Sequence, residues 1–546
     1  MLDDLQLDSI TDPHAREVIQ RLLNHIETVI AEVDRLKAEN LLLRDEVNRL
    51  KGAQGRPTGP HGRTVAPDVS SDAERRVLRG RVRQPKIDQI AIHREVRCPV
   101  DPALLPPDAQ YKGTVVVIVQ DLELHSDNIR FLKEKWYAPS TGQTYLGPLP
   151  EGYDGQFGPQ ITSLAWLLSN VGQMSQSKIR EVFRLAGIRV SSGHLGQILI
   201  QQANRDAEAT EVAEASLAAT PWQQVDHTVT RVNGDDQQCH ILTTPLATVA
   251  HTHPGKDRLS TLDSLRNNRP RTFLWNAEAE AILFPRGLSA GVRRNRDLLP
   301  RDTVFDAAKL THLLDTHVAN AGRTQRQWIV EARALAAYRV ATDEPVVQML
   351  LSDDAPQLGG ICAEHALCWV HDGRHYKKLR PRVAIHHEAL RTFLEDYWAY
   401  YHEVRAYQEV PTATERARVE ARFDTLFATV TDDDALDDRI AKTRVNRTEL
   451  LQVLAHPELP LHHNAAELGC RVRVRRRDVR FGPRTAGGVR AWDVGLTLVA
   501  TAKKLGVTIY AYIQDRLTGR NKLPSLADLI TQRAQELNLG ASWATP

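Results

Sequence analysis

Residues 1–51 carry the most regular alternation of apolar and polar positions in this chain of 546 residues. Apolar residues recur there at steps of three and four, which is the a/d repeat of a coiled coil. Asn40 takes an a position, where a polar residue favours a two-stranded register. The pattern predicts a parallel dimerisation helix; an amphipathic helix packed on its own chain is the alternative. The seam consists of Ile19, Leu22, Ile26, Val29, Val33, Leu36, Asn40, Leu43, Val47 and Leu50. The flanking charges suit a parallel pair, with Glu32, Glu39 and Glu46 at g and Lys37, Arg44 and Lys51 at e.

Three units of different pattern follow this helix. Residues 52–85 are rich in Gly, Pro and Arg without periodicity, which predicts a flexible basic linker. Residues 86–150 contain short apolar runs between turns and predict a small β-rich module. Residues 151–210 carry three helical periods, with Gly187 placed to end the second helix and Ser191 to cap the third. These helices suit either a DNA-binding helix-turn-helix or a plain helical connector.

After residue 210, β-branched runs alternate with helical periods, which predicts a multidomain α/β protein. The stretches 270–343 and 384–458 carry helical periods only, and the aromatic residues around Trp398 are expected in the core of the second. The acidic run at 432–438 is expected to be a solvated helix start. The other expected elements are strands near 223–229, 238–243, 247–251 and 346–351, and a helix near 259–266.

Composition and charge bear on the cellular location of the protein and on the surfaces that could bind nucleic acid. Five cysteines are too few for a disulfide framework, and neither a signal peptide nor an apolar run of membrane-spanning length is present, so we expect a cytoplasmic protein without a membrane partner. The net charge is only +2, so a nucleic-acid surface must come from local clusters. Three clusters stand out: Arg75, Arg76, Arg79, Arg81, Arg83 and Lys86; Arg374, Lys377, Lys378, Arg380 and Arg382; and Arg471, Arg473, Arg475, Arg476, Arg477 and Arg480.

Three acidic residues in separate parts of the chain are the candidate chemistry. Asp226 lies on an expected strand, Asp353 directly follows one, and Glu467 lies on a helical segment just before the third basic cluster. Carboxylates in such settings can hold two divalent ions against a phosphodiester, because Mg²⁺ prefers oxygen ligands. Asp354 is the alternative to Asp353. A basic run is usually only a solvated face, but one beside a phosphoryl-transfer site favours phosphate contact.

The segments LPLHHNAAELGCR (459–471) and RFGPRTAGGVRAWDVGLTLVATAKKLGVTIYAYIQDRL (480–517) resemble the DDE transposases of the insertion sequence sixty-six (TnpC-type) family. The resemblance implies a ribonuclease-H-like core in two parts, 211–383 and 459–520, with the helical insertion 384–458 between them and a C-terminal helix and tail at 521–546. The family usually places Asn and Arg around the glutamate, where this chain has Ala465, Ala466 and Leu468, and the segment 270–343 is extra.

A metal-dependent transposase is what this resemblance implies. Asp226 would bridge two Mg²⁺ or Mn²⁺ ions, and Asp353 and Glu467 would each complete one shell. The partners would be transposon-end DNA, target DNA and further copies of the chain, with accessory transposition proteins left open, in a nucleoid-associated cytoplasmic protein. The phosphate-contacting residues would be Arg471, Arg473, Arg475, Arg476, Arg477, Arg480, Lys377 and Lys378.

Cysteine and histidine positions bear on a second metal. The family often has a zinc ribbon of paired cysteines within 86–150, where this chain has only Cys98. Cys362, His365, Cys368 and His371 recur every three residues, and on a continuous helix such side chains turn away from one another, so we expect no structural zinc. Cys368 and His371 also match a C-x-x-H pattern that follows the second aspartate in several transposase families; with Asn464 they would support the site.

Two other functions remain open from the sequence. A non-catalytic dimeric DNA-binding protein derived from a transposase would use the N-terminal helix and the helical unit alone. A metal-dependent DNA nuclease would cut without joining, and only a strand-transfer assay separates it from a transposase.

Overall fold

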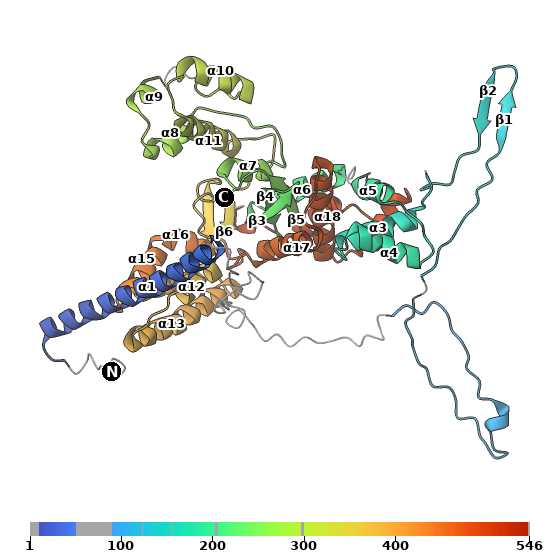
Figure 1. Ribbon diagram of the computed structural model, residues 1–546, viewed down its shortest axis with the longest axis horizontal. Helices are drawn as coiled ribbons and strands as arrows, with labels where there is room; N and C mark the ends of the chain where they lie inside the picture. The colour runs from blue at the N-terminus through green and yellow to red at the C-terminus, as the bar shows by residue number, and fades with distance from the viewer. Residues whose placement is uncertain are drawn as a thin grey trace.

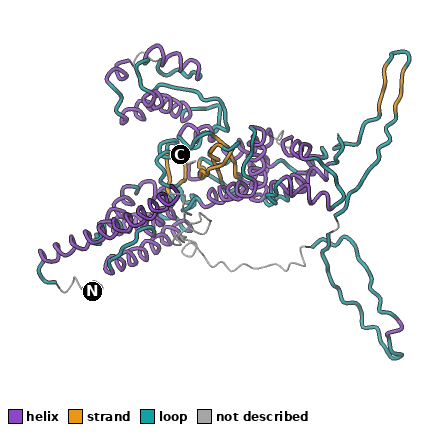
Figure 2. Tube along the Cα trace, in the orientation of Figure 1, coloured by secondary structure: helices purple, strands orange, loops and turns teal. Residues whose placement is uncertain are grey.

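The computed structural model describes residues 10–50, 90–122, 124–153, 155–201, 206–295 and 300–543. It is a multidomain, mixed α/β protein in which one mixed sheet lies between helical lobes (Figures 1 and 2). The expected linker and its basic cluster (Arg75 to Lys86) lie outside the described residues, as does Lys51.

The central sheet combines an antiparallel meander with two parallel strands. β3 (Trp222–Val232), β4 (Asp235–Thr243) and β5 (Thr248–His253) form the meander, and β6 (Met349–Ser352) and β7 (Glu364–Leu367) run parallel to β3, in the order β5-β4-β3-β6-β7. The expected strands of the meander and β6 are confirmed. β7 was not expected, because the sequence there had been interpreted as helical.

Alternate residues of the meander point to opposite faces, as strand geometry requires. On one face, Cys239, Ile241 and Ala250 pack against α17 (Asn464–Arg480) and α18 (Ala486–Leu505). The other face packs against α7 (Arg258–Leu265), and its buried strand residues include Val225, Leu242 and Val249. Both faces are therefore covered, which positions the elements that carry the candidate site.

The extra segment forms a helical lobe on this second face (Figure 1). The apolar residues of its helices and those of α7 form one continuous hydrophobic core. This segment, which lies outside the expected catalytic core, is therefore well buried. The lobe contains α8 (Ala277–Leu283), α9 (Ala290–Asn295), α10 (Ala307–His317) and α11 (Arg323–Arg339), which confirms the helical character expected of 270–343.

A second helical lobe holds the expected insertion. Trp369 lies at its centre, in contact with the rings of Tyr397, Tyr400, Phe423 and Phe427, and Trp398 is buried as expected. The expected helix start in the acidic run is also confirmed, since Asp433 caps α15. The lobe contains α12 (Trp369–Lys377), α13 (Ala384–Glu409), α14 (Ala413–Leu426), α15 (Asp434–Val445) and α16 (Arg447–Leu450).

The three helices expected within 151–210 are confirmed as α3 (Pro159–Asn170), α4 (Gln176–Leu185) and α5 (Ser192–Gln201). Gly187 ends α4 with a φ of +80°, and the Ser191 hydroxyl accepts a hydrogen bond from the backbone N–H of His194 at the start of α5. The other elements are α6 (Asp206–Ala218), α19 (Ile509–Leu517), α20 (Leu526–Glu536) and short 3-10 helices at Pro102–Leu104, Phe284–Arg286, Gln452–Leu454 and Ala541–Trp543.

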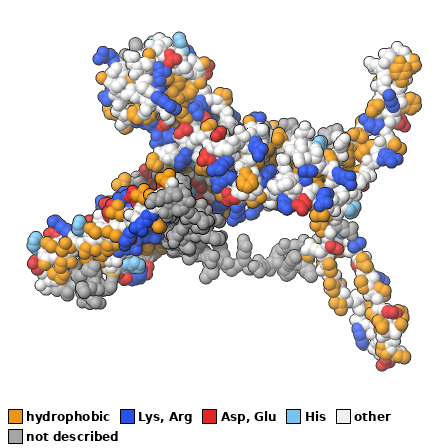
Figure 3. All heavy atoms as spheres, viewed as in Figure 1, with side chains coloured by type: hydrophobic (Ala, Val, Ile, Leu, Met, Phe, Trp, Pro, Cys, Tyr) orange, Lys and Arg blue, Asp and Glu red, His pale blue; other side chains and the backbone are white. Residues whose placement is uncertain are grey.

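The expectation of a β-rich module over 86–150 is largely wrong. The described part of this region contains one hairpin, β1 (Lys135–Ala138) with β2 (Gln143–Leu146), that projects from the body (Figure 1). The apolar run around Val115 forms no strand, and that side chain is 91% exposed, because no second strand or helix covers it. Figure 3 shows exposed hydrophobic side chains along these projecting segments.

The N-terminal helix α1 (Pro13–Leu50) is one continuous helix, and its N-terminal half packs on the second helical lobe. Leu23 is buried there, and Asp34 pairs with Arg382 at 2.9 Å. The Glu27 carboxylate accepts hydrogen bonds from the backbone N–H groups of Arg382 and Val383 at 2.6–2.9 Å. It thereby holds the two residues that lead into α13, whose N-cap residue, Val383, has no side-chain oxygen of its own.

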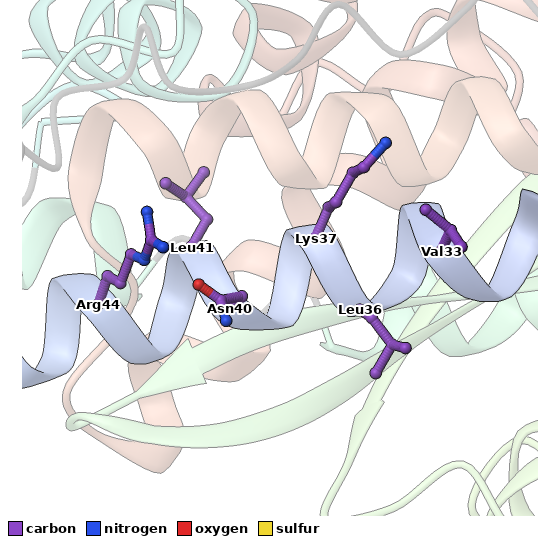
Figure 4. Close-up of a pocket in the computed structure, with 6 residues that line it drawn as sticks. All are labelled: Val33, Leu36, Lys37, Asn40, Leu41 and Arg44. Carbon is purple, nitrogen blue, oxygen red and sulfur yellow. The ribbon is translucent and has the colours of Figure 1, made fainter.

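The coiled-coil seam remains largely exposed in the single chain. Its packed N-terminal half agrees with the alternative of a helix packed on its own chain, whereas its C-terminal half is open, so dimerisation stays a prediction. A shallow groove lies along this part of α1 (Figure 4), and none of the three candidate carboxylates lines it; the lining residues are Val33, Leu36, Lys37, Asn40, Leu41 and Arg44. The exposed seam residues include Leu22, Val29, Val33, Leu36, Leu43, Val47 and Leu50.

Among the described residues, no single helix has both the length and the apolar composition to span a membrane; α18 and α19 meet these two conditions only together, across a bend of 120°.

Replacing Glu27 by Ala should lower the free energy of unfolding by about 1–3 kcal/mol, because the backbone N–H groups of Arg382 and Val383, just before α13, lose their charged acceptor. Urea unfolding measures this, and hydrogen exchange at the amides of Arg382 and Val383 should rise in parallel. Glu32→Ala is the control, since Glu32 only pairs with Arg35 on the exposed side of α1. Equal losses in both variants would contradict this role of Glu27.

Candidate active site

Neighbouring parallel strands bring Asp226 and Asp353 together. Gln224 of β3 is paired with Leu351 of β6, and Asp226 and Asp353 each follow two residues later on these strands. The hydrogen-bond register therefore places the two aspartates at the same level of the sheet. This juxtaposition requires β6 to return beside β3 after more than one hundred intervening residues. Local patterns of apolar and polar residues carry no information about a pairing at that distance in the sequence.

Glu467 reaches the same place from the other side of β3. It lies in the first turn of α17, which packs across β3, and Cys470 one turn later contacts Asp226 through a hydrogen bond from its thiol. The close approach depends on Gly469, since a Cβ there would lie 2.7 Å from the Ile241 side chain. The three candidate carboxylates are therefore gathered at one site from a strand, a strand end and a helix.

The pKa of Asp226 reflects this gathering. Burial and, to a smaller extent, the negative charges of Asp353 and Glu467 together raise it to about 6, against the hydrogen bonds from the His227 N–H and the Cys470 thiol, which lower it. Desolvated carboxylates that repel one another are a costly arrangement unless a cation balances them. The site therefore has the electrostatics of a cation-binding centre.

Asp354 points elsewhere. It is exposed and forms an ion pair with His375 at 3.3 Å, and the hydrogen bond from that imidazole lowers its pKa to about 2. Asp353 is half-buried, and its Oδ1 accepts a hydrogen bond from the backbone N–H of Ala355 at 3.2 Å. The side chains of these adjacent aspartates thus have different partners, and Asp353 is the one that acts on Asp226.

Arg374 is a site residue that the sequence placed only in a basic cluster. Its Nη1 lies 3.0 Å from Oε1 of Glu467, with both side chains mostly buried. His371 Nε2 lies 3.5 Å from the same oxygen, and Arg471 lies 3.6 Å from Oε2. The i, i+3 spacing of His371 and Arg374 on one helix was the signal that could have found this contact.

His371 lies beside Glu467 and Cys368 beside His371, but the Cys/His series does not lie on one continuous helix. Glu364–Leu367 forms β7, and Cys368 is the N-cap of α12, so the helical premise for the Cys/His series is wrong. His365 instead contacts the Ser352 hydroxyl at 2.7 Å. Burial raises the pKa of the Cys368 thiol to about 11, although hydrogen bonds from the backbone N–H groups of His463 and His371 lower it in part.

His463 joins this pair and was missed from the sequence. It is the N-cap residue of α17, directly before the half-buried Asn464, and its ring stacks on that of His371 with centroids 4.4 Å apart. The ligand atoms of Cys368, His371 and His463 all lie within 4.8 Å of one another. The starts of α12 and α17 are held together by a hydrogen bond from Trp369 N to Leu461 O at 3.0 Å.

The expectation that the whole third basic cluster contacts DNA is wrong for Arg473 and Arg476. Arg473 is fully buried, where it pairs with Asp493 at 2.9 Å and bonds the hydroxyls of Thr230 and Thr252. Arg476 is also buried. The guanidinium groups of Arg473, Arg476 and Arg480 all lie within 5.4 Å of the Trp492 ring centroid. These arginines anchor α17, because helical spacing turns them toward the core.

The other expected DNA contacts lie at or near the surface. Arg471 and Arg475 are exposed, and Arg477 is half-buried with Nη1 donating to the Val229 carbonyl at 2.6 Å. Lys378 is exposed, and the Lys377 ammonium lies 5.6 Å from the Trp398 ring centroid.

Four histidines on the meander form a further group that the sequence did not indicate. The rings of His227, His240 and His253 contact one another across β3, β4 and β5 in tilted and edge-to-face geometry, with centroids 4.1 and 4.7 Å apart, and His251 lies next to His253. Burial lowers the pKa of all four, so they are neutral at pH 7. They pack the sheet rather than carry charge.

Comparison with known proteins adds one relative. An uncharacterized protein named y4jO, from Sinorhizobium fredii (strain NBRC 101917 / NGR234), is 28% identical over 324 residues, which cover 59% of this chain and 99% of the relative. No protein-family model matches the chain. No solved structure matches it significantly. The residues of the site are therefore the basis for a functional proposal.

Asp226→Asn should stabilise the protein when divalent ions are chelated. The pKa of Asp226 is about 6 in the folded state against 3.8 ordinarily, so its ionisation costs stability as the pH rises from about 4 to about 6, and the full cost is present above that range. The variant should gain about 1–3 kcal/mol at pH 7.5 and little at pH 4. Urea unfolding in a chelating buffer measures the difference. Asp236→Asn, on the exposed end of the same hairpin, is the control; a gain that does not depend on pH would contradict this account.

Arg473→Ala and Arg475→Ala should separate anchoring from DNA contact. Loss of Arg473 leaves Asp493 buried without its partner and should cost about 3–5 kcal/mol of unfolding free energy. Loss of the exposed Arg475 should change stability by less than about 0.5 kcal/mol. It should also weaken binding to DNA of any sequence and reduce the salt slope by about one. Thermal unfolding and DNA titrations at several salt concentrations test both, and the opposite pattern would reverse the assignment.

Proposed function

We propose that this protein is a DNA transposase of a bacterial insertion sequence, resembling the insertion sequence sixty-six family, that cleaves transposon ends and joins them to target DNA. The observation that carries the proposal is the convergence of Asp226, Asp353 and Glu467 from three distant segments at one partly buried site. A trio of carboxylates without a metal is costly, so its presence favours a function that uses one.

The fold supports the same proposal. The order β5-β4-β3-β6-β7, with a meander extended by two parallel strands, suits the ribonuclease-H-like core that the resemblance implies. The first aspartate lies on the first strand of this sheet, and the glutamate lies on a helix that follows the helical insertion. The exposed seam of α1 suits the proposed dimer of a coiled coil.

The site residues fit two hard divalent ions. All three carboxylates offer the oxygen donors that Mg²⁺ or Mn²⁺ prefers, and both Asp353 and Glu467 lie close enough to Asp226 to raise its pKa. Asp226, Asp353 and Glu467 would therefore hold these ions together, and Asp226 is the carboxylate that senses the charge of both others. When bound, the ions supply Lewis-acid activation of water or a DNA 3′-hydroxyl and stabilise the leaving oxygen.

The protein groups around the trio orient it and receive the DNA. Arg374 holds Oε1 of Glu467 and balances its charge, and the Cys470 thiol donates to Asp226. The exposed side chains of Arg471, Arg475 and Lys378 supply positive charge that suits phosphates without base recognition. Phosphate contacts of this kind position a DNA strand, whereas sequence is recognised elsewhere.

A metal-dependent DNA nuclease is the second candidate, because the same trio would serve hydrolysis alone. A non-catalytic DNA-binding protein is less well supported, since it has no need for three converging carboxylates. Joining of a cleaved 3′ end to a second DNA separates the transposase from the nuclease.

The test uses the full-length protein with labelled DNA from the inverted repeats that flank its coding region. Single changes of Asp226→Asn, Asp353→Asn and Glu467→Gln keep the side-chain size but remove a ligand charge. Each should reduce cleavage and joining by several orders of magnitude, since metal catalysis supplies several kcal/mol and each 1.4 kcal/mol is about tenfold in rate. End binding should persist.

Asp354→Asn and Asp434→Asn are the matched controls, because both side chains are exposed and lie outside the trio. They should retain most of the activity. Activity that survives all three ligand changes would show that the proposed reaction is wrong, and cleavage without joining in the wild type would favour the nuclease.

A further inference from the structure

Cys368, His371 and His463 form a second group of metal-ligand side chains, distinct from the three carboxylates. They come from the N-caps of two helices and the first turn of one, and their ligand atoms lie within 4.8 Å of one another. Cys368 and His463 are buried, and His371 is half-buried. The group therefore brings together one sulfur and two imidazole nitrogens away from bulk solvent.

The distances suit one tetrahedral ion. Cys368 Sγ lies 3.4 Å from His371 Nδ1. Two ligands of one zinc ion, with bonds of about 2.3 Å to sulfur and about 2.05 Å to nitrogen, lie about 3.6 Å apart. The ligand atom of His463 lies within 4.8 Å of the other two, and rotation of its ring out of the stack with His371 would bring it to the same ion.

An unpartnered nitrogen is an independent observation for a ligand. His463 is 1% exposed, and its Nδ1 is buried without a hydrogen-bond partner among the described residues. A buried polar atom left without a partner costs about 1–3 kcal/mol, so such an atom in a folded protein needs an explanation. A bound cation would supply one.

We propose that Cys368, His371 and His463 bind one zinc ion, with a water molecule or a substrate oxygen in the fourth position. Sulfur and imidazole ligands favour Zn²⁺ over Mg²⁺, which prefers oxygen. The expectation of no structural zinc depended on a helix through Cys368, and the strand and helix boundary at that residue removes its basis. The N-termini of α12 and α17 carry partial positive charge, which disfavours a cation at this place. The same charge stabilises the Cys368 thiolate, which is the form that binds zinc.

Zinc at this site would also fix the position of Glu467. Histidines that bind zinc through one nitrogen usually donate the other N–H to a carboxylate, which orients both groups. His371 Nδ1 faces the thiol, while its Nε2 lies 3.5 Å from Oε1 of Glu467. Arg374 Nη1 also lies 3.0 Å from His371 Nε2. If zinc binds Nδ1, then Nε2 carries the proton and donates to Glu467, and Arg374 keeps its own hydrogen bond to Glu467. This second step rests on the proposed function, whereas zinc binding does not.

The test measures zinc directly in the purified full-length protein, without DNA. After dialysis against metal-free buffer, elemental analysis should find one zinc per chain. Replacement by Co²⁺ should give the near-ultraviolet charge-transfer band of a cobalt–thiolate bond. Cys368→Ser should lose that band, and His463→Ala should lose the zinc. Glu467→Gln should lower zinc affinity by about 10- to 100-fold, the usual effect of removing an outer-shell carboxylate.

Cys362→Ser is the matched control, since Cys362 is equally buried but lies outside the group. It should keep both the zinc and the cobalt spectrum. The proposal is wrong if the folded wild type binds no zinc, or if its Co²⁺ complex lacks the thiolate band; these measurements on the wild type do not depend on the folding of any variant. Zinc binding without DNA cleavage would retain this site while overturning the proposed reaction.

Discussion

The packing of α17 on the central sheet is the constraint on which the rest of the site depends. This helix carries Glu467 and Cys470 to Asp226, and it can approach β3 and β4 closely only because Gly469 has no side chain at the contact. The pairing of β6 with β3 then supplies Asp353 on the other side. Both conditions concern backbone geometry, so the carboxylates meet because two backbone contacts bring their elements together.

The helical lobes extend this arrangement in different ways. The extra segment joins the core on the α7 face and buries apolar surface, which stabilises the sheet from the side away from α17. The second lobe brings α12 to the edge of the site, so Arg374 and His371 approach Glu467 from an element that precedes the insertion. The site is thus assembled from four regions of the chain that have no local sequence relation.

Much of this could be predicted from patterns in the sequence. The meander, β6 and the helices of both lobes follow from period-2 and helical alternation, and the three carboxylates were identified from their settings on those elements. The three-residue spacing from Cys362 to His371 misled the prediction, because a strand ends and a helix begins at Cys368 within that series. Patterns also failed at Val115, since an apolar β-branched run forms a strand only when a second strand is available to pair with it.

The basic cluster on α17 shows a different limit. Six arginines within ten positions suggested one charged surface, but a helix turns successive residues to different sides, so Arg473 and Arg476 face Trp492 and the interior while Arg475 faces solvent. Composition alone carries no information on direction. The sequence likewise contained no sign that His463 lies beside His371, because that contact depends on the start of α17 packing against the start of α12.

The buried arginines also set the rotational phase of α17. A helix that turned about its axis by the angle of one residue, about 100°, would move Glu467 away from Asp226. It would at the same time pull Arg473 from Asp493 and from the threonine hydroxyls of β3 and β5. Arg473, near the middle of α17, therefore fixes the rotation of the helix and with it the direction in which the Glu467 carboxylate points.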